Sequence, residues 1–171
     1  MKTGLALGML LLTSAAFADE VVESDDLVRA LTPQEAEQPR TRSLGLSRAI
    51  KVRVKSKVDL KIPFEFNSSN LAPEAEAQLL QLIEALNRDA LSTFRFEIAG
   101  HTDASGAAEY NRRLSEARAN AVRQFLVARG IAPNRLESVG LGEEELADPD
   151  RPNHADNRRV EIRNLGNSGD L

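Results

Sequence analysis

Residues 94–131 read FRFEIAGHTDASGAAEYNRRLSEARANAVRQFLVARGI and place a strand pattern directly before a helix pattern. Phe94, Phe96 and Ile98 alternate with polar or charged residues. This period of two predicts a half-buried strand. The strand should end at the loop Gly100-His101-Thr102-Asp103, so polar side chains follow the strand end directly.

The second half of this stretch has the spacing of an amphipathic helix. Its apolar and small residues recur at intervals of three and four. These residues are Tyr110, Leu114, Ala117, Ala121, Phe125 and Ala128. Ser105 with Gly106 offers a start, Ser115 could instead cap a separate second segment, and Gly130 favours the end of the helix.

The flanking segments complete a repeating order of strands and helices. Apolar residues alternate with polar ones from Ile50 as far as Phe66, which predicts a strand or hairpin. Pro73 suits the first turn of a helix, and the apolar stripe that follows is Leu79, Leu82, Ile83 and Leu86. Residues 136–141 and 158–163 predict two further strands. The order βαβαββ predicts an α/β (α+β) sandwich, a mixed sheet with two main helices packed on one face.

Bulk composition limits the class of protein. The 171 residues, 42% apolar and 28% charged, support one folded domain, which we place at residues 48–165. A formal net charge of -4 with scattered basic residues argues against a nucleic-acid partner. Cysteine is absent from the sequence, which excludes disulfides, thiolate metal sites, cysteine nucleophiles and lipidation of a cysteine.

The first 18 residues have the pattern of a secretory signal peptide. Lys2 is followed by an apolar stretch, and Ala16-Phe17-Ala18 places small residues where a signal peptidase cleaves. We expect cleavage before Asp19. An uncut membrane anchor is the alternative, but the apolar stretch is shorter than the roughly 20 residues that span a bilayer. We expect no transmembrane segment in the mature chain.

Residues 19–47 are rich in acidic, polar and proline residues, which predicts a flexible, solvated linker. The alternative is a short helix that binds a partner through its few apolar residues. These are Val21, Val22, Leu27 and Leu31. Residues 166–171 are predicted to be a disordered tail.

Asp103 and Arg118 are the candidates for chemistry outside the core. Asp103 follows a strand end, and Arg118 lies on the helix after the same loop. In one continuous helix, Asn111, Leu114 and Arg118 share a face. On residue types alone, Asp103 and Arg118 could simply pair with each other or with a neighbour such as Glu116, an arrangement that contributes little.

Several separate motifs resemble one family. The run GHTDASGAAEYNRRLSEARANAVRQFL, then RGI, RLESVGLGEEE and NRRVEI, is similar to the OmpA-like carboxy-terminal family, over roughly residues 50–164. That family includes peptidoglycan-associated lipoproteins and flagellar stator proteins such as MotB. The resemblance implies non-covalent binding of peptidoglycan through the diaminopimelate residue of its stem peptide. Asp103 would accept from the ligand ammonium and Arg118 would grip its carboxylate, as a forked cation does well.

The resemblance implies further ligand-binding positions, which carry over less directly. Leu114 also fits a core role, and Asn67 also fits a turn. These positions are Thr102, Asn111, Leu114, Arg159, Phe66 and Asn67. Cofactors and metals are not implied.

The chain departs from relatives that carry a lipidated cysteine or a barrel. We therefore expect an exported, periplasmic, cell-wall-bound protein of a Gram-negative envelope, associated with the outer membrane only through envelope proteins that its linker recruits.

Two other function classes stay open. A hydrolase or metal enzyme could use His101, Asp103 and His154, but a third strong ligand at recognisable spacing is missing. A periplasmic protein-interaction module could have the same fold without binding peptidoglycan. We expect a binding protein and not an enzyme.

Overall fold

The computed structural model describes residues 21–33 and 56–167. Its main elements are α1 (Ser24–Leu31), β1 (Lys57–Leu60), α2 (Ala75–Asn87), β2 (Phe94–His101), α3 (Ala108–Ala128), β3 (Leu136–Gly142) and β4 (Val160–Asn167). Short 3₁₀ turns at Pro133–Arg135 and Ala155–Asn157 precede β3 and β4. From β1 onward this is the predicted βαβαββ order.

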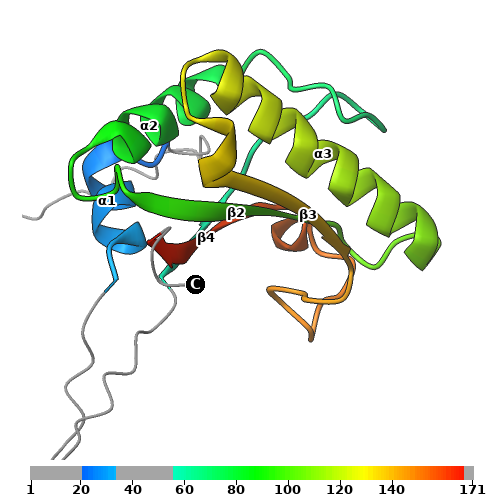
Figure 1. Ribbon diagram of the computed structural model, residues 1–171. Helices are drawn as coiled ribbons and strands as arrows, with labels where there is room; N and C mark the ends of the chain where they lie inside the picture. Colours follow the sequence, from blue (N-terminus) through cyan, green and yellow to red (C-terminus); the bar gives the residue numbers. More distant parts are fainter. Residues whose placement is uncertain (1–20, 34–55, 168–171) are drawn as a thin grey trace, which may run out of the picture.

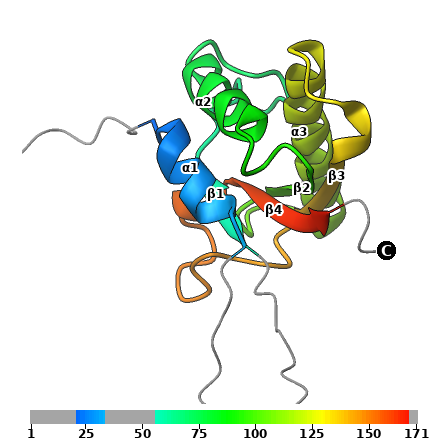
Figure 2. The ribbon, with the colours of Figure 1, turned by 60° about the vertical axis from the view of Figure 1, so that its left-hand side comes forward.

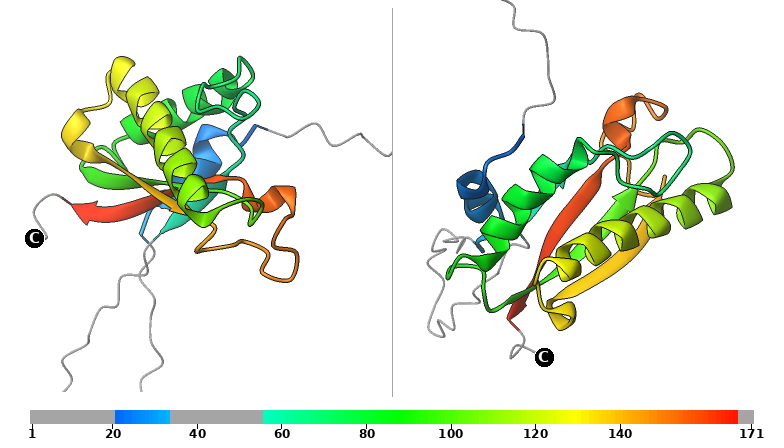
Figure 3. Two further views of the ribbon diagram at one scale, coloured as in Figure 1. Left: turned by 90° about the vertical axis from the view of Figure 1, so that its right-hand side faces the viewer. Right: turned by 90° about the horizontal axis from the view of Figure 1, so that it is seen from above.

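The strands of this region form one four-stranded mixed sheet in the order β1-β4-β2-β3. β2 and β3 are parallel, whereas β4 is antiparallel to both β1 and β2. Helices α2 and α3 cover the same face of the sheet (Figures 1 and 3). The predicted sandwich with two main helices on one face is confirmed.

The core lies between this face and the helices because the strands alternate. Phe96 and Ile98 of β2 and Ile162 of β4 are almost fully buried, and Leu79 and Leu82 of α2 pack over them. Residues of opposite parity on the same strands point to the face without helices.

The face that α3 turns to the sheet differs from the predicted stripe. Its buried residues are Asn111, Ser115, Ala119, Val122 and Leu126, whereas Tyr110 is 41% exposed. The physical reason is the close approach of α3 to two strand glycines. A Cβ at Gly100 would lie 2.2 Å from the Ser115 carbonyl oxygen, and one at Gly140 would lie 2.4 Å from the Glu116 nitrogen. Small residues therefore face the sheet here, and larger apolar ones lie to the side.

Ser115 takes part in this contact and does not cap a second helix. Its hydroxyl donates to the carbonyl of Arg112 and accepts from the backbone N–H of Gly142 at 2.9 Å. Helix α3 is continuous from Ala108 to Ala128.

Residues 21–33, the described part of the predicted linker, pack on the domain and are not solvated throughout. In residues 21–33, Leu27 and Leu31 of α1 are fully buried, and α1 lies beside α2 (Figure 2). The Gln78 side chain accepts from the Val22 N–H at 2.7 Å, and Asn164 donates to the Leu31 carbonyl at 2.8 Å. These partners lie far away in sequence, so composition alone could not reveal them. Residues 1–20, which include the predicted signal peptide, residues 34–55 and residues 168–171 lie outside the described residues.

The first strand is shorter than predicted. Ile50 to Val54 lie outside the described residues, and β1 ends at Leu60. Pro63 has no N–H to donate to a ladder, and the segment after it forms only an isolated bridge between Phe64 and Leu71. At the other end, β4 continues to Asn167, two residues into the predicted tail.

In residues 21–33 and 56–167, no helix combines the length and the apolar character needed to cross a bilayer.

The glycine contact predicts a specific loss of stability. Gly100→Ala should lower the free energy of unfolding by about 3 kcal/mol, because the added methyl group overlaps the α3 backbone. Gly130→Ala is the control. Its Cβ meets nothing within 4 Å, and only its positive φ of 99° opposes the substitution, a cost of about 1 kcal/mol. Urea unfolding followed by circular dichroism measures both, and an equal loss in the two variants would contradict the packing account.

The packing of α1 can be tested in the same way. Leu27→Ala should destabilise the chain by about 3 kcal/mol, because it leaves a cavity under α1. Arg29→Ala changes an exposed residue of the same helix and should shift the free energy of unfolding by less than about 0.5 kcal/mol. If both variants unfold like the parent chain in urea, α1 does not contribute to the core in solution.

Candidate functional site

The loop after β2 holds Asp103 in a fixed orientation. The Asp103 carboxylate accepts from the Ser105 N–H at 3.0 Å and from Arg158 Nη1 at 2.7 Å, and its side chain is only 13% exposed. Burial alone would raise the pKa of Asp103, but the hydrogen bonds from Arg158 and Ser105 outweigh it and lower this pKa. Asp103 is therefore a fixed anion.

Asn111 fastens this loop to α3. Its side-chain NH₂ group lies within hydrogen-bonding distance of the carbonyls of Asp103 and Ser105, at 3.3 and 3.1 Å, and of the Glu143 carboxylate at 2.7 Å. Thr102 is buried beside it, and its N–H donates to the Gly142 carbonyl. Asn111 and Thr102 therefore help to hold the Asp103 loop in place.

Arg118 lies one helical turn after Leu114, which is itself partly buried. The Arg118 Nε donates to the Ser68 carbonyl at 3.1 Å, and its guanidinium carbon lies 5.0 Å from the centroid of the Phe64 ring. Burial lowers the pKa of Arg118, but a guanidinium remains charged. In the described part of the chain, no carboxylate forms an ion pair with Arg118.

A cavity of about 320 Å³ opens beside Arg118. Four parts of the chain contribute to it: the segment after β1, the end of β2, α3, and the turn before β4. Its lining residues are Lys61, Ile62, Pro63, Phe64, His101, Arg118, Ala155, Asp156, Arg158 and Arg159. Cationic side chains outnumber anionic ones in this lining. Asp103 does not line the cavity, but its carboxylate forms an ion pair with Arg158, which does.

The direct pair of Asp103 with Arg118 is therefore not formed, because Arg158 pairs with Asp103 instead. Arg158 was not singled out from the sequence. The only signal was its place beside Arg159 in the NRRVEI motif. The predicted strand 158–163 included Arg158, but β4 begins only at Val160, so strand alternation did not give the direction of this side chain. Phe64, whose ring lies against the Arg118 guanidinium, was predicted only as a strand residue.

The other predicted residues are spread around the cavity. Arg159 lines it, but its guanidinium also lies 3.3 Å from Asp59 and 3.5 Å from Glu161. Asn67 has a φ of 50° and accepts a hydrogen bond from the Tyr110 hydroxyl, and Phe66 beside it is fully exposed. Thus only Arg118 and Arg159 among the predicted residues line the cavity itself.

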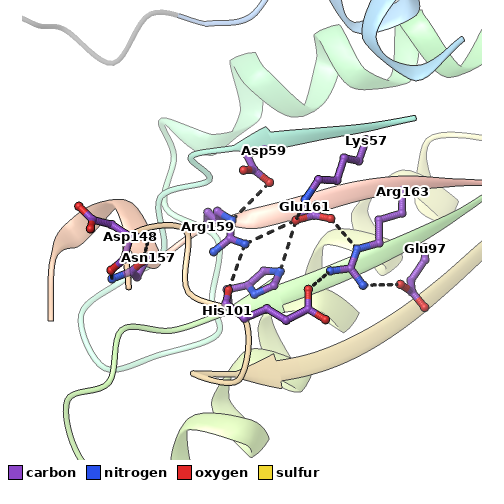
Figure 4. Close-up of polar contacts among 10 residues, drawn as sticks. Lys57, Asp59, Glu97, His101, Asp148, Asn157, Arg159, Glu161 and Arg163 are labelled. Carbon is purple, nitrogen blue, oxygen red and sulfur yellow. Dashed lines mark hydrogen bonds and ion pairs between the residues drawn. The ribbon is translucent and has the colours of Figure 1, made fainter. Parts of the chain in front are cut away.

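The sheet face without helices carries a buried polar network (Figure 4). At its centre, Glu161 accepts from Lys57 Nζ at 3.2 Å and from Arg163 Nε at 2.5 Å, and its side chain is inaccessible to solvent. Arg163 also binds Glu97 and Glu145. Burial alone would raise the pKa of Glu161, but the hydrogen bonds from Arg163 and Lys57 and their charges lower it to about 2.

His101 joins this network at the cavity wall. Its side chain is fully buried and its Nε2 lies 3.9 Å from Glu161. Burial, together with the charge of Arg159, lowers the pKa of His101 to about 4, which keeps the ring neutral at pH 7. His154 lies elsewhere, where its Nδ1 accepts from the Asp156 N–H. Within residues 21–33 and 56–167, no group of three or more His, Cys, Asp or Glu could hold a metal ion.

With this geometry in place, the comparison with known proteins identifies the family. The OmpA family matches residues 63–160, which contain the Asp103 loop, α3 and most of the cavity lining. The chain belongs to the OmpA family.

Individual relatives agree. The chain is 40% identical over 103 residues to the peptidoglycan-associated lipoprotein of Pseudomonas aeruginosa, covering 58% of this chain and 59% of that protein. It spans about three fifths of the length of the curated lipoproteins that it matches. The crystal structure of the peptidoglycan-associated lipoprotein from Burkholderia pseudomallei has 31% identity and a TM-score of 0.51, covering 60% of this chain and 87% of that chain.

A third relative shows the fold alone. The periplasmic domain of Helicobacter pylori MotB, at 21% identity, has a TM-score of 0.57 and covers 68% of this chain and 86% of that chain. The names of these three relatives describe association with the cell wall or a place in the envelope, not a catalytic activity.

The neutral state of His101 predicts a dependence of stability on pH. The pKa of His101 is lowered on folding, so protons bind the unfolded chain more tightly, and stability falls as the pH drops from about 6.5 towards 4. We expect the chain to be about 2 kcal/mol less stable at pH 5 than at pH 7. His101→Gln should remove most of this fall in urea unfolding, whereas the control His154→Gln should keep it. A fall that persists in His101→Gln would show that other groups cause it.

Proposed function

We propose that this domain binds peptidoglycan without a covalent bond, through the diaminopimelate residue of the stem peptide. The observation that carries the proposal is Arg118, a half-buried cation on a cavity wall whose charge has no carboxylate partner in the described residues. The free end of diaminopimelate has one carboxylate and one ammonium group. Its carboxylate fits the guanidinium fork of Arg118.

Asp103 supplies the complementary charge. Its carboxylate is fixed by the Ser105 N–H and already carries one cationic partner, Arg158. Arg158 is half-exposed and can move aside, so a ligand ammonium can share or take over this carboxylate. Asn111 and Thr102 then keep the loop in place, Leu114 lies one turn before Arg118 on α3, and Arg159 lines the cavity just before β4.

The cellular setting follows from the same proposal. Two of the named relatives are peptidoglycan-associated lipoproteins. We infer that residues 1–18 export the chain to the periplasm, where the domain attaches it to the cell wall. The role is one of binding, with neither cofactor nor catalytic residue, and residues outside the described part connect it to envelope proteins.

Sedimentation with insoluble peptidoglycan sacculi tests the proposal directly. The chain without residues 1–18 should sediment with sacculi, and Arg118→Ala and Asp103→Asn should remain in the supernatant. The expected loss is about 2 to 5 kcal/mol, or more than 10-fold in affinity, because each substitution leaves a ligand charge unpaired. Arg118→Lys should recover only part of the binding, since lysine cannot bind a carboxylate through a fork.

Arg113→Ala is the matched control, because Arg113 is an exposed arginine of the same helix that pairs only with Glu109. It should sediment like the parent chain. Circular dichroism verifies that each variant is folded. If the parent chain stays in the supernatant, or Arg113→Ala is lost equally, the proposed pocket is wrong and a protein-interaction module becomes the better description.

A further inference from the structure

The aromatic side chain of Phe66 is exposed to solvent. Its exposed fraction is 100%, the largest among the large apolar residues of the described chain. A fully exposed phenylalanine gains nothing from burial in the free protein. A single exposed apolar residue is common on protein surfaces, so the meaning of Phe66 depends on how its turn is held and on what lies beside it.

The turn that carries Phe66 is held in one shape. The Glu65 N–H donates to the Asn70 carbonyl at 2.9 Å, and the Asn70 side chain donates to the Glu65 carboxylate at 2.9 Å. Asn67, next to Phe66, has the left-handed φ of 50° and accepts from the Tyr110 hydroxyl. Phe66 is therefore presented on an ordered turn, and binding a ligand there orders little additional chain.

Tyr110 is a second exposed aromatic residue near Phe66. It is 41% exposed, lies in the first turn of α3, and reaches Asn67 through its hydroxyl. Phe66 and Tyr110 thus both adjoin Asn67. We refer to Phe66 and Tyr110 as the aromatic rim.

The aromatic rim lies close to the pocket. Phe66 is two residues from Phe64, which lies over Arg118, and two residues from Ser68, whose carbonyl accepts from Arg118. Two peptide units span at most about 7.6 Å between Cα atoms. In peptidoglycan, a lactyl group and two stem residues separate diaminopimelate from the sugar, a reach of about 10 Å. A diaminopimelate bound at Arg118 therefore leaves its own glycan strand within reach of the aromatic rim.

We propose that the aromatic rim is a second binding site, which takes an N-acetylated sugar ring of the glycan strand. The C–H groups on one face of a pyranose ring are apolar and slightly positive, and the face of an aromatic ring is negative. Such a ring can stack on Phe66, while the Tyr110 edge is within reach of the N-acetyl group. This inference rests on the proposed function of the pocket and adds the glycan strand to its ligand.

Two soluble probes separate the sites. One is the stem tripeptide that ends in diaminopimelate, and the other is the same tripeptide attached to its disaccharide. By isothermal titration calorimetry, the parent chain without residues 1–18 should bind the disaccharide tripeptide roughly 3- to 10-fold more tightly than the tripeptide, the range that one aromatic contact gives. Phe66→Ala should bind the two probes with equal affinity, because the sugar contact that distinguishes them is lost.

Two further variants test the chemistry. Phe66→Trp keeps an aromatic face and should retain the preference for the disaccharide tripeptide. Leu80→Ala is the control, since Leu80 is a 46% exposed apolar residue of α2 that does not line the pocket, and it should bind like the parent chain.

The outcomes distinguish the inference from the proposed function. If the parent chain binds both probes equally, or if Phe66→Ala weakens both probes by the same factor, Phe66 does not contact the sugar and the inference is overturned. If the parent chain binds neither probe, the proposed function fails and the inference fails with it.

Discussion

The structure depends on the contact between the backbone of α3 and the strands below it. Gly100 and Gly140 leave no room for a side chain between sheet and helix, so the two elements meet through backbone and have little freedom to slide or rotate. The Ser115 hydroxyl accepts from the Gly142 N–H at the same contact. Because Arg118 follows Ser115 on α3, its height above the sheet is determined by these glycines. The Asp103 loop begins three residues after Gly100, so the same contact positions both charges of the site.

The opposite face of the sheet stabilises the site from below. Glu161, Arg163 and Lys57 connect β4 to β1, and Glu145 brings in the segment after β3. Removing one member of such a buried network leaves an uncompensated charge, which typically costs about 3 to 5 kcal/mol. Arg159 belongs both to this network and to the cavity lining, so its position is fixed by Glu161 before any ligand binds. A substitution at Arg159 would therefore disturb fold and site together.

Local patterns predicted the order of the elements, because strand parity and helical spacing are properties of neighbouring residues. The parts that failed depend on contacts over long distances. The spacing around Tyr110 indicated a helix correctly but suggested the wrong buried face, since only the three-dimensional closeness of Gly100 to Ser115 decides it. Leu27 and Leu31 lie in a segment whose composition resembles a linker, and their partners on α2 are about 50 residues away.

In the candidate site, too, local patterns could be predicted and contacts over long distances could not. Asp103 and Arg118 could be selected from the sequence because the motif and the family resemblance agree. Arg118 lines the cavity, and Asp103 is connected to the cavity wall through its ion pair with Arg158. Their partners could not be selected. Arg158 lies 55 residues after Asp103, in a turn where no periodicity gives the direction of a side chain, and the Ser68 carbonyl is a backbone group that any residue would supply.

The pairing of Asp103 with Arg158 has a consequence for which ligands fit. A ligand with only a carboxylate could bind Arg118, but it would also bring a negative charge close to Asp103. A ligand with only an ammonium would have to compete with Arg158 for Asp103 beside the positive Arg118. A zwitterionic centre satisfies both at once, because its ammonium replaces the contact that Arg158 gives up while its carboxylate neutralises Arg118. In the proposed site, two charges of opposite sign, one of them already paired with the half-exposed Arg158, would discriminate by the arrangement of charge in the ligand more than by its net charge.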